Sequence, residues 1–496
     1  MISRRFFLRT IGVGAAALAV ANRSNAAQAS DDRPNIVFIL VDDQRNDTLG
    51  CAGHKIIKTP VVDALAAKGV RFSNTFVTTS ICAASRASIF TGLHERTHGY
   101  TFEKPSVSKA HTAASYPILL RNAGYRTGFI GKYGVWMEGG RGKMFDFFKP
   151  FWGPRHVPQP DGSTRHTAEI CGDKSIEFIR NDSGKKADKK KPFCLSISFP
   201  SVHAVDGNLK PGSGHYPWPK AVDGMYDDVK IPSPRLSKPE VFENQPEFLR
   251  KSMNRQRWFW RWDTPEKYQT NIRAYYRMIS GVDRVIGRVV DELKKQGLDK
   301  NTVIIYTGDN GYYMGQRGFA GKWSHYEESL RVPLVIYDPR PGASQRGKVD
   351  DAVALNVDLA ATMLDLGGVP TPKHYSGRSL TPMLKGKTPA DWRTDFFCEH
   401  LMEFKPIPKW EGVRGPRYVY ARYFAQKPQY EFLHDLKADP DQLKNFATDP
   451  KYADTLKKMQ ARCDTLREIH GGVYVAPKKV IRFPRTKKNK KTENES

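Results

Sequence analysis

The run Asn35-Ile36-Val37-Phe38-Ile39-Leu40-Val41 is almost entirely apolar and rich in branched side chains. A strand of a parallel sheet has this composition when helices cover both of its faces. Asp42 and Asp43 follow the run directly. Two carboxylates at the tip of a buried strand are costly unless a positive group binds them. Ligands of such sheets bind at the carboxyl ends of the strands, so this run predicts both the core and the edge that carries the site.

The same alternation of apolar runs and helical patterns continues along the chain. Further buried strands are expected at residues 125–131, 192–200, 301–307 and 332–337, and a long amphipathic helix at 266–297. Polar residues cluster after several of these strands. The pattern predicts an α/β fold with a doubly wound, mostly parallel sheet and helices on both faces.

The length of 496 residues suits one large domain and a smaller one. The predicted division is an export signal at 1–29, the main α/β domain at 30–375, a small C-terminal α+β subdomain at 376–475 and a basic disordered tail at 476–496. The subdomain is expected from its short extended segments and one helix. The tail is too polar and too rich in lysine to pack.

The N-terminus predicts export. Arg4 and Arg5 precede an apolar run at 11–21 and a small-residue cleavage site at 27–29. This run is too short to span a bilayer permanently, so no stable membrane insertion is expected. The paired arginines resemble a twin-arginine (Tat) export signal, with an ordinary secretory signal as the alternative. We expect an exported bacterial protein, periplasmic or secreted, with the Tat export machinery as a partner.

Composition narrows the class of partner. The chain has 79 Lys and Arg against 52 Asp and Glu, a net charge of +27. This balance favours a polyanion such as an acidic polysaccharide, or simply gives a basic surface. We expect no nucleic-acid partner, because the chain has no zinc-finger spacing and no basic zipper. Six scattered cysteines without a C-x-x-C pattern argue against a zinc site and a dense disulfide framework, and leave one or two disulfides open.

A second informative stretch begins at Cys82. Residues 82–92 are expected to form a helix that ends at Gly92, with Cys82 near its N-terminus and Arg86 one turn further on. The backbone amides and the helix dipole favour anions at that end. A buried cysteine at a helix cap is the plain alternative.

The sequence Cys82-Ala83-Ala84-Ser85-Arg86, followed by Thr91-Gly92, resembles the signature of type I, formylglycine-dependent sulfatases of the alkaline phosphatase superfamily. In that family the cysteine is oxidised to formylglycine, which implies a formylglycine-generating enzyme as a partner. The arginine of the signature steadies the modified residue. The resemblance also implies the family's large α/β sheet with a small C-terminal subdomain.

The resemblance implies a metal site as well. Asp42, Asp43, Asp309 and Asn310 match the family's metal residues, and the modified residue 82 completes the set. These are hard oxygen donors, which suit Ca²⁺, Mg²⁺ less well, and not zinc.

The remaining catalytic roles follow from the same resemblance. Lys132 and Lys322 match the lysines that hold the sulfate oxygens, and His203 is the candidate proton donor to the leaving oxygen. A hydrated formylglycine has two hydroxyls on one carbon: one attacks sulfur, and loss of the proton from the other expels sulfate. A serine has no second hydroxyl for that last step.

Two positions depart from the family pattern. Gly134 stands where many relatives have the histidine that removes the last proton. The resemblance implies that some members, such as those acting on glucosamine 6-sulfate, also lack this histidine. The base is therefore open among His98, His325 and Asp42. Arg317, in a segment that is usually Gly-Glu-His-Gly, is expected near the pocket, where it would favour an anionic substrate.

Together these matches imply an enzyme, a sulfuric ester hydrolase that removes sulfate from a sulfated carbohydrate. One alternative is a formylglycine-dependent hydrolase of phosphonate or phosphate monoesters. Another is a non-catalytic relative that binds polyanions. The aromatic stretch at 258–262 is expected either to stack on sugar rings or to pack as a loop.

Overall fold

The structure is a computed structural model that describes residues 32–102, 105–151, 155–182, 191–206, 214–342 and 347–476. The predicted export signal, and the predicted tail beyond residue 476, lie outside the described residues.

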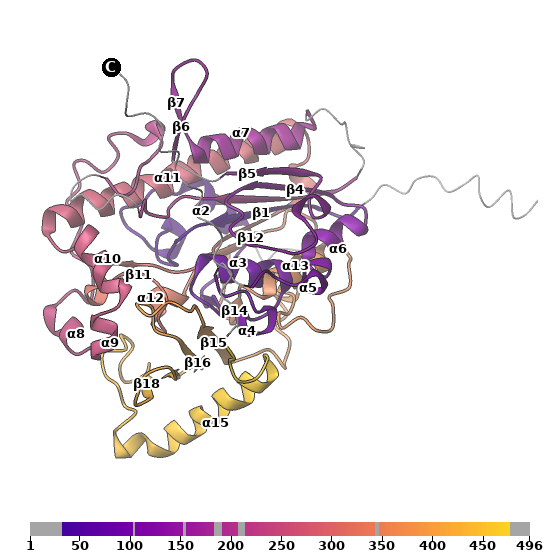
Figure 1. The fold of residues 1–496 in the computed structure, drawn as a ribbon. Coiled ribbons are helices and arrows are strands. Elements are labelled where there is room, and N and C mark those ends of the chain that lie inside the picture. Colours follow the sequence, from indigo (N-terminus) through magenta and orange to yellow (C-terminus); the bar gives the residue numbers. More distant parts are fainter. Residues whose placement is uncertain are drawn as a thin grey trace, which may run out of the picture.

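An eight-stranded sheet forms the centre of the main domain, in the order β13-β2-β12-β9-β1-β8-β4-β5 (Figure 1). Its strands are β1 (Asn35–Val41), β2 (Val70–Phe72), β4 (Arg126–Gly131), β5 (Phe147–Pro150), β8 (Phe193–Phe199), β9 (Thr302–Gly308), β12 (Leu334–Tyr337) and β13 (Lys348–Asp350). β1 pairs in parallel with β8 and β9, whereas β12 runs antiparallel to both of its neighbours. The predicted mostly parallel sheet is therefore confirmed, with β12 as the exception.

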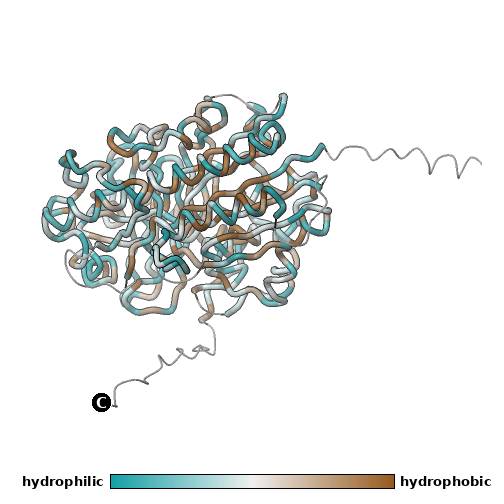
Figure 2. Tube along the Cα trace, turned by 90° about the horizontal axis from the view of Figure 1, so that it is seen from above, coloured by the Kyte–Doolittle hydropathy of each residue, from teal (hydrophilic) through white to brown (hydrophobic). Residues whose placement is uncertain are grey.

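The alternation of side chains along β1 builds two cores, one on each face of the sheet. Ile36, Phe38 and Leu40 pack on one side, and Val37, Ile39 and Val41 pack on the other. The first core is covered by α3 (Cys82–Thr91), α6 (Tyr116–Asn122) and α13 (Asp358–Leu366), and the second by α2 (Pro60–Lys68), α7 (Thr167–Arg180) and α11 (Pro265–Lys295). Figure 2 shows the hydrophobic segments gathered inside this layered body. A run that is apolar at every position is thus explained by helices on both faces.

A second sheet forms the C-terminal subdomain, as predicted. Its four antiparallel strands are β15 (Phe396–His400), β16 (Trp410–Arg414), β17 (Tyr418–Tyr423) and β18 (Tyr430–Asp435). α15 (Ala453–Ile469) packs on it through Cys463 and Leu466. The subdomain touches the main domain where Thr79 bridges to Glu399 of β15.

The segment between residues 214 and 265 is partly helical. It contains α8 (Pro239–Glu243), α9 (Glu247–Arg250) and α10 (Met253–Arg261). The aromatic stretch at 258–262 is therefore largely helical, and its interpretation as a loop is wrong. The other short elements are β3 (Thr75–Phe76), β6 (His156–Pro158), β7 (Thr164–His166), β10 (Tyr313–Met314), β11 (Ala320–Gly321), β14 (Ala354–Leu355), α4 (Glu95–His98), α5 (Lys109–Ala113), α12 (Glu327–Leu330) and α14 (Thr381–Leu384).

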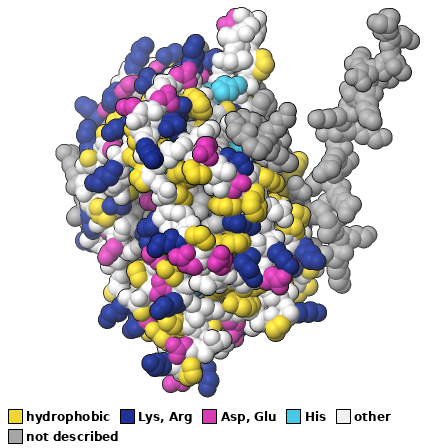
Figure 3. Space-filling view, turned by 90° about the vertical axis from the view of Figure 1, so that its left-hand side faces the viewer, with side chains coloured by type: hydrophobic (Ala, Val, Ile, Leu, Met, Phe, Trp, Pro, Cys, Tyr) yellow, Lys and Arg dark blue, Asp and Glu magenta, His cyan; other side chains and the backbone are white. Residues whose placement is uncertain are grey.

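All six cysteines lie within the described residues, and all are free thiols. None of the helices that the structure describes has the length and apolar character needed to cross a bilayer. On the face drawn in Figure 3, Lys and Arg side chains are widespread and interspersed with Asp and Glu.

Arg96 joins the two domains through buried ion pairs. Its Nε lies 2.7 Å from Glu399 and its Nη2 lies 2.8 Å from Glu411. We expect Arg96→Met to lower the free energy of unfolding by about 3–5 kcal/mol, because the buried Glu399 carboxylate loses its cationic partner, while Glu411 keeps Arg422. Urea unfolding measures this loss. Arg121→Met, which breaks an exposed pair with Asp146, should cost less than about 1 kcal/mol, and equal losses in the two variants would contradict the assignment.

Candidate active site

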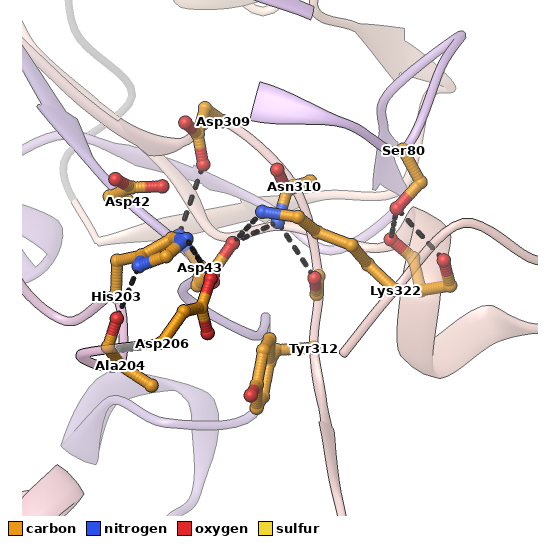
Figure 4. A network of polar contacts seen from close by, with 12 residues as sticks. Asp42, Asp43, Ser80, His203, Ala204, Asp206, Asp309, Asn310, Tyr312 and Lys322 are labelled. Carbon is orange, nitrogen blue, oxygen red and sulfur yellow. Dashed lines mark hydrogen bonds and ion pairs between the residues drawn. The ribbon is translucent and has the colours of Figure 1, made fainter. Parts of the chain in front are cut away.

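The carboxyl ends of four neighbouring strands converge on one site. β1 leads to Asp42 and Asp43, and β9 leads to Asp309 and Asn310 (Figure 4). The backbone N–H of Asp43 donates to Asp309 Oδ1 at 3.0 Å, and Asn310 Nδ2 donates to Asp43 Oδ1 at 2.7 Å. The four residues predicted as metal ligands therefore lie side by side. The pairing of β1 with β9 brings them together, although they are far apart in the sequence.

Three oxygens of this cluster have no hydrogen-bond partner although they are buried: Asp42 Oδ1, Asp43 Oδ2 and Asn310 Oδ1. One ligand atom each of Asp42, Cys82 and Asp309 also lie within 4.8 Å of one another. Buried oxygens without partners are costly, and a cation bound among them would remove that cost. The donors are carboxylate and amide oxygens, so the residues fit a hard divalent cation.

Three basic side chains surround the carboxylates. Lys132 Nζ contacts Asp42 Oδ2, Lys322 Nζ contacts Asp43 Oδ1, and Arg86 Nη2 lies 2.8 Å from Asp309 Oδ2. Burial alone would raise the pKa of Asp42 and of Asp43, but the neighbouring lysines outweigh burial and hold both pKa values below the ordinary range.

Asp309 behaves differently from the other two carboxylates. Burial, followed by the nearby Asp42 carboxylate, raises the pKa of Asp309 to about 6. A cation bound beside Asp309 would stabilise its charged form, which burial and Asp42 disfavour. A cation site is also what the three unpartnered oxygens indicate.

Cys82 is the first residue of α3, and it is buried. Gly92 ends the helix in the left-handed conformation at φ 67°, as the sequence predicted. Arg86, one turn after Cys82, donates from Nε to Asp309 at 2.9 Å and from Nη1 to the Lys132 carbonyl at 2.6 Å. Its guanidinium also contacts Ser198 Oγ, a residue that the sequence did not single out.

His203 follows β8 and reaches the same cluster. Its Nδ1 donates to the Ala204 carbonyl at 2.6 Å, while its Nε2 lies 3.7 Å from Asp43 and 4.0 Å from Asp206. Because Nδ1 keeps its proton for the carbonyl, Nε2 carries a proton only in the imidazolium form. Burial lowers the pKa of His203 to about 4, although the aspartates oppose this shift.

Of the three candidates for the base that removes the last proton, Asp42 lies in the metal cluster, whereas His98 and His325 are bound by other side chains. Position 134, where the usual histidine is missing, lies beside the cluster. A Cβ on Gly134 would lie 3.5 Å from Arg86 Cδ and 3.7 Å from Lys132 Cε, so a histidine there would enter the site. His98 instead hydrogen-bonds Ser88 at 3.1 Å, and His325 hydrogen-bonds Tyr423 and His434 at 3.0 Å each.

The expectation for Arg317 is wrong. Its side chain is fully buried, and its Nε lies 3.2 Å from both carboxylate oxygens of Glu328. The guanidinium also donates to the Asp441 and Gln442 carbonyls. Arg317 therefore stabilises the fold next to the C-terminal subdomain, and Glu328 neutralises its charge there.

Sequence reasoning missed a row of polar residues on α10. Asn254 donates to the Lys322 carbonyl at 2.7 Å, and Arg257 and Arg261 bind the two oxygens of Asp206 at 2.7 and 2.6 Å. Their spacing of three and four residues is that of one helix face, and this spacing was a usable signal in the sequence.

Comparison with known proteins identifies the family. The Sulfatase family model matches residues 34–369, and the model of the C-terminal region of N-sulphoglucosamine sulphohydrolase matches residues 315–469. The chain is 29% identical to an N-acetylglucosamine-6-O-sulfatase of Bacteroides thetaiotaomicron, over 90% of this chain and 88% of that protein.

Two solved structures share the fold. A complex with the substrate D-glucosamine-2-N,6-O-disulfate has a TM-score of 0.75 and 26% identity, covering 88% of this chain and 98% of that one. A phosphonate monoester hydrolase of Agrobacterium radiobacter has a TM-score of 0.70 and 23% identity, covering 88% and 96%. The family model, which spans more than half of the chain, shows that this protein belongs to the type I sulfatase family of sulfuric ester hydrolases, within the alkaline phosphatase superfamily.

Proposed function

We propose that this protein removes sulfate from a sulfated carbohydrate, with residue 82 as a formylglycine nucleophile and Ca²⁺ as its metal. The observation that carries the proposal is the group of three buried, unpartnered oxygens beside Cys82, ringed by Arg86, Lys132 and Lys322. Oxygen ligands for a divalent cation, flanked by several basic side chains, suit the binding of an oxyanion substrate. Mg²⁺ suits the site less well, because it prefers a smaller octahedral shell.

Each side chain then has a task in the reaction. Asp42, Asp43, Asp309 and Asn310 would hold the ion, which would supply positive charge to the sulfate oxygens and acidify the hydroxyl of residue 82. Lys132 and Lys322 would turn from their carboxylates toward the remaining sulfate oxygens. Arg86 keeps Asp309 in place beside residue 82.

The departing oxygen needs a proton. We assign this to His203 Nε2, which lies at the edge of the cluster on a side chain that is 18% exposed. The pKa of about 4 disfavours the imidazolium form that carries this proton, and the negative charge of a bound sulfate would favour that form and raise the pKa. His203→Ala should lower kcat on a sugar sulfate about 10²- to 10⁴-fold, because an alkoxide leaves poorly. Hydrolysis of 4-nitrophenyl sulfate should fall far less, since the phenolate needs no proton. The exposed His156 gives the control His156→Ala; equal losses on both substrates would rule out the acid role.

The substrate class follows from the relatives. A relative named for 6-O-desulfation of N-acetylglucosamine, and the fold match to the glucosamine disulfate complex, support a 6-sulfated amino sugar. The glycine at position 134 agrees with this class, because the resemblance implies that its members also lack the usual histidine.

The alternative ester is a phosphonate or phosphate monoester, which the fold match to a phosphonate monoester hydrolase keeps open. Assays of matched 4-nitrophenyl sulfate, phosphate and phenylphosphonate separate the two. We expect the sulfate to give the highest kcat/KM. A higher value on either phosphorus ester, or no turnover of any of the three, would refute the proposal.

Export and maturation complete the proposal. We propose that residues 1–29 direct export through the Tat machinery to the periplasm or beyond, with residues 30–375 as the catalytic domain, 376–475 as the subdomain and 476–496 as a basic tail. A formylglycine-generating enzyme would act on Cys82. A peptide spanning residue 82 should then be lighter than the unmodified cysteine peptide, because one sulfur and two hydrogen atoms are replaced by one oxygen atom. Mass spectrometry of the purified protein measures this difference.

A further inference from the structure

A group of guanidinium side chains lies beyond His203, outside the cluster of aspartates and lysines already described. Asp206 lies 4.0 Å from His203 Nε2 and binds Arg257 and Arg261 at 2.7 and 2.6 Å. Arg155 donates to the His203 carbonyl at 3.4 Å. Two guanidinium groups thus bind one carboxylate, and a third lies at the neighbouring backbone, so Arg and Asp side chains here carry a net positive charge.

Arg155, Arg257 and Arg261 each have a buried Nε without a hydrogen-bond partner, and of the three Arg257 is the one stacked on the residue that follows Lys322. Arg261 is fully buried and also binds Tyr312. Arg257 is 13% exposed at its side chain, and its Nε has no hydrogen-bond partner although it is buried. An unpaired donor in a charged group is costly to bury, and an anionic ligand would satisfy it.

Two independent contacts place Arg257 beside the cluster of aspartates and lysines. On one side Asp206 links it to His203. On the other side its Cζ lies 4.7 Å from the centroid of the Trp323 ring, and Trp323 directly follows Lys322. Figure 4 shows Asp206, His203 and Lys322 around the Asp43 carboxylate. A sugar whose leaving oxygen lay at His203 would therefore have Asp206 and Arg257 as neighbours.

We propose that Arg257, together with the face of Trp323, forms a second anion-binding subsite that recognises another anionic group on the sugar carrying the scissile sulfate. This proposal rests on the proposed function and deepens it. The planar guanidinium, fixed by Asp206 and stacked on the indole, offers Nε and Nη1 to a sulfate or carboxylate. A neutral N-acetyl group offers a single carbonyl oxygen and no charge, so it would bind the guanidinium less strongly.

The test compares N-acetylglucosamine 6-sulfate with glucosamine 2-N,6-O-disulfate. The wild type should prefer the disulfate in kcat/KM. Arg257→Gln should lower kcat/KM on the disulfate at least about tenfold, with a change of less than about threefold on the N-acetyl compound. Arg257→Lys should keep part of the preference, because it keeps the charge. The exposed Arg250 gives the control Arg250→Gln, which should change neither value.

Several results would overturn the subsite. Wild-type preference for the N-acetyl compound would do so, as would equal losses on both compounds in Arg257→Gln, which would assign Arg257 to supporting Asp206. Unchanged values in Arg257→Gln would place the residue outside the substrate path. Failure of the wild type on 4-nitrophenyl sulfate as well would instead overturn the proposed function, and with it the subsite.

Discussion

Cys82→Ser is expected to lose steady-state hydrolysis of 4-nitrophenyl sulfate by roughly 10⁵-fold or more, the scale of removing a catalytic nucleophile. The serine hydroxyl can form a bond to sulfur while the phenolate leaves. The resulting sulfate ester has no second hydroxyl on the same carbon, so it cannot expel sulfate as a formylglycine hydrate can. The variant should therefore turn over once and stop.

Two measurements check this result. Steady-state release of nitrophenol should vanish, and the intact peptide carrying residue 82 should gain the mass of one SO₃ group after exposure to substrate. Cys51→Ser is the matched control, because Cys51 is also a free thiol but lies after β1 in the separate segment at 50–52. Sustained turnover by Cys82→Ser, or equal losses in both variants, would remove residue 82 from the chemistry.

The sequence was most informative where one run of residues suffices to define an element. The run at 35–41 coincides with β1 because full burial demands apolar side chains at every position. The run at 301–307 lies within one residue of β9, and its parallel pairing with β1 explains why both ligand pairs meet. The ends of these strands could be predicted, so the meeting of Asp42, Asp43, Asp309 and Asn310 could be predicted too.

The direction of β12 could not be predicted in this way. A short buried strand has the same composition in either direction, and only its pairing with β9 and β2 reveals that it is antiparallel. The helices between residues 214 and 265 could not be predicted either, because prolines are frequent there, yet Pro239 opens α8 and Pro246 caps α9. Proline is accepted at the first turn of a helix, so a proline-rich stretch need not be a loop.

Contacts between side chains that are far apart in the sequence could not be predicted either. Arg317 was expected near the pocket from its place after β9, but Glu328 and the 441–442 backbone bind it inside the fold. Asp206 and Arg257 are 51 residues apart and meet only because α10 packs against the site. Motif matching finds residues shared by a family, whereas such contacts depend on the packing of this chain.

Asp43→Asn should abolish the stabilisation of this protein by Ca²⁺. The Asp43 carboxylate gives Oδ1 to Asn310 and Lys322 and leaves Oδ2 without a partner. An ion that binds only the folded state adds about 2.7 kcal/mol to its stability at one hundred times its Kd. The amide keeps the shape of the side chain but removes one negative charge and a carboxylate ligand, so Ca²⁺ affinity should fall more than about 10²-fold, and turnover with it.

Thermal unfolding with added Ca²⁺ or with a chelator separates metal binding from catalysis, because it requires no substrate. The wild-type melting temperature should rise with Ca²⁺, rise less with Mg²⁺, and fall with the chelator, whereas that of Asp43→Asn should stay constant. Asp47→Asn removes a half-exposed carboxylate that pairs with Arg45, and should respond to Ca²⁺ like the wild type. A wild type that is indifferent to Ca²⁺, or an Asp43→Asn variant that is still stabilised by it, would mean that the unpartnered oxygens at the tips of β1 and β9 serve some purpose other than holding this ion.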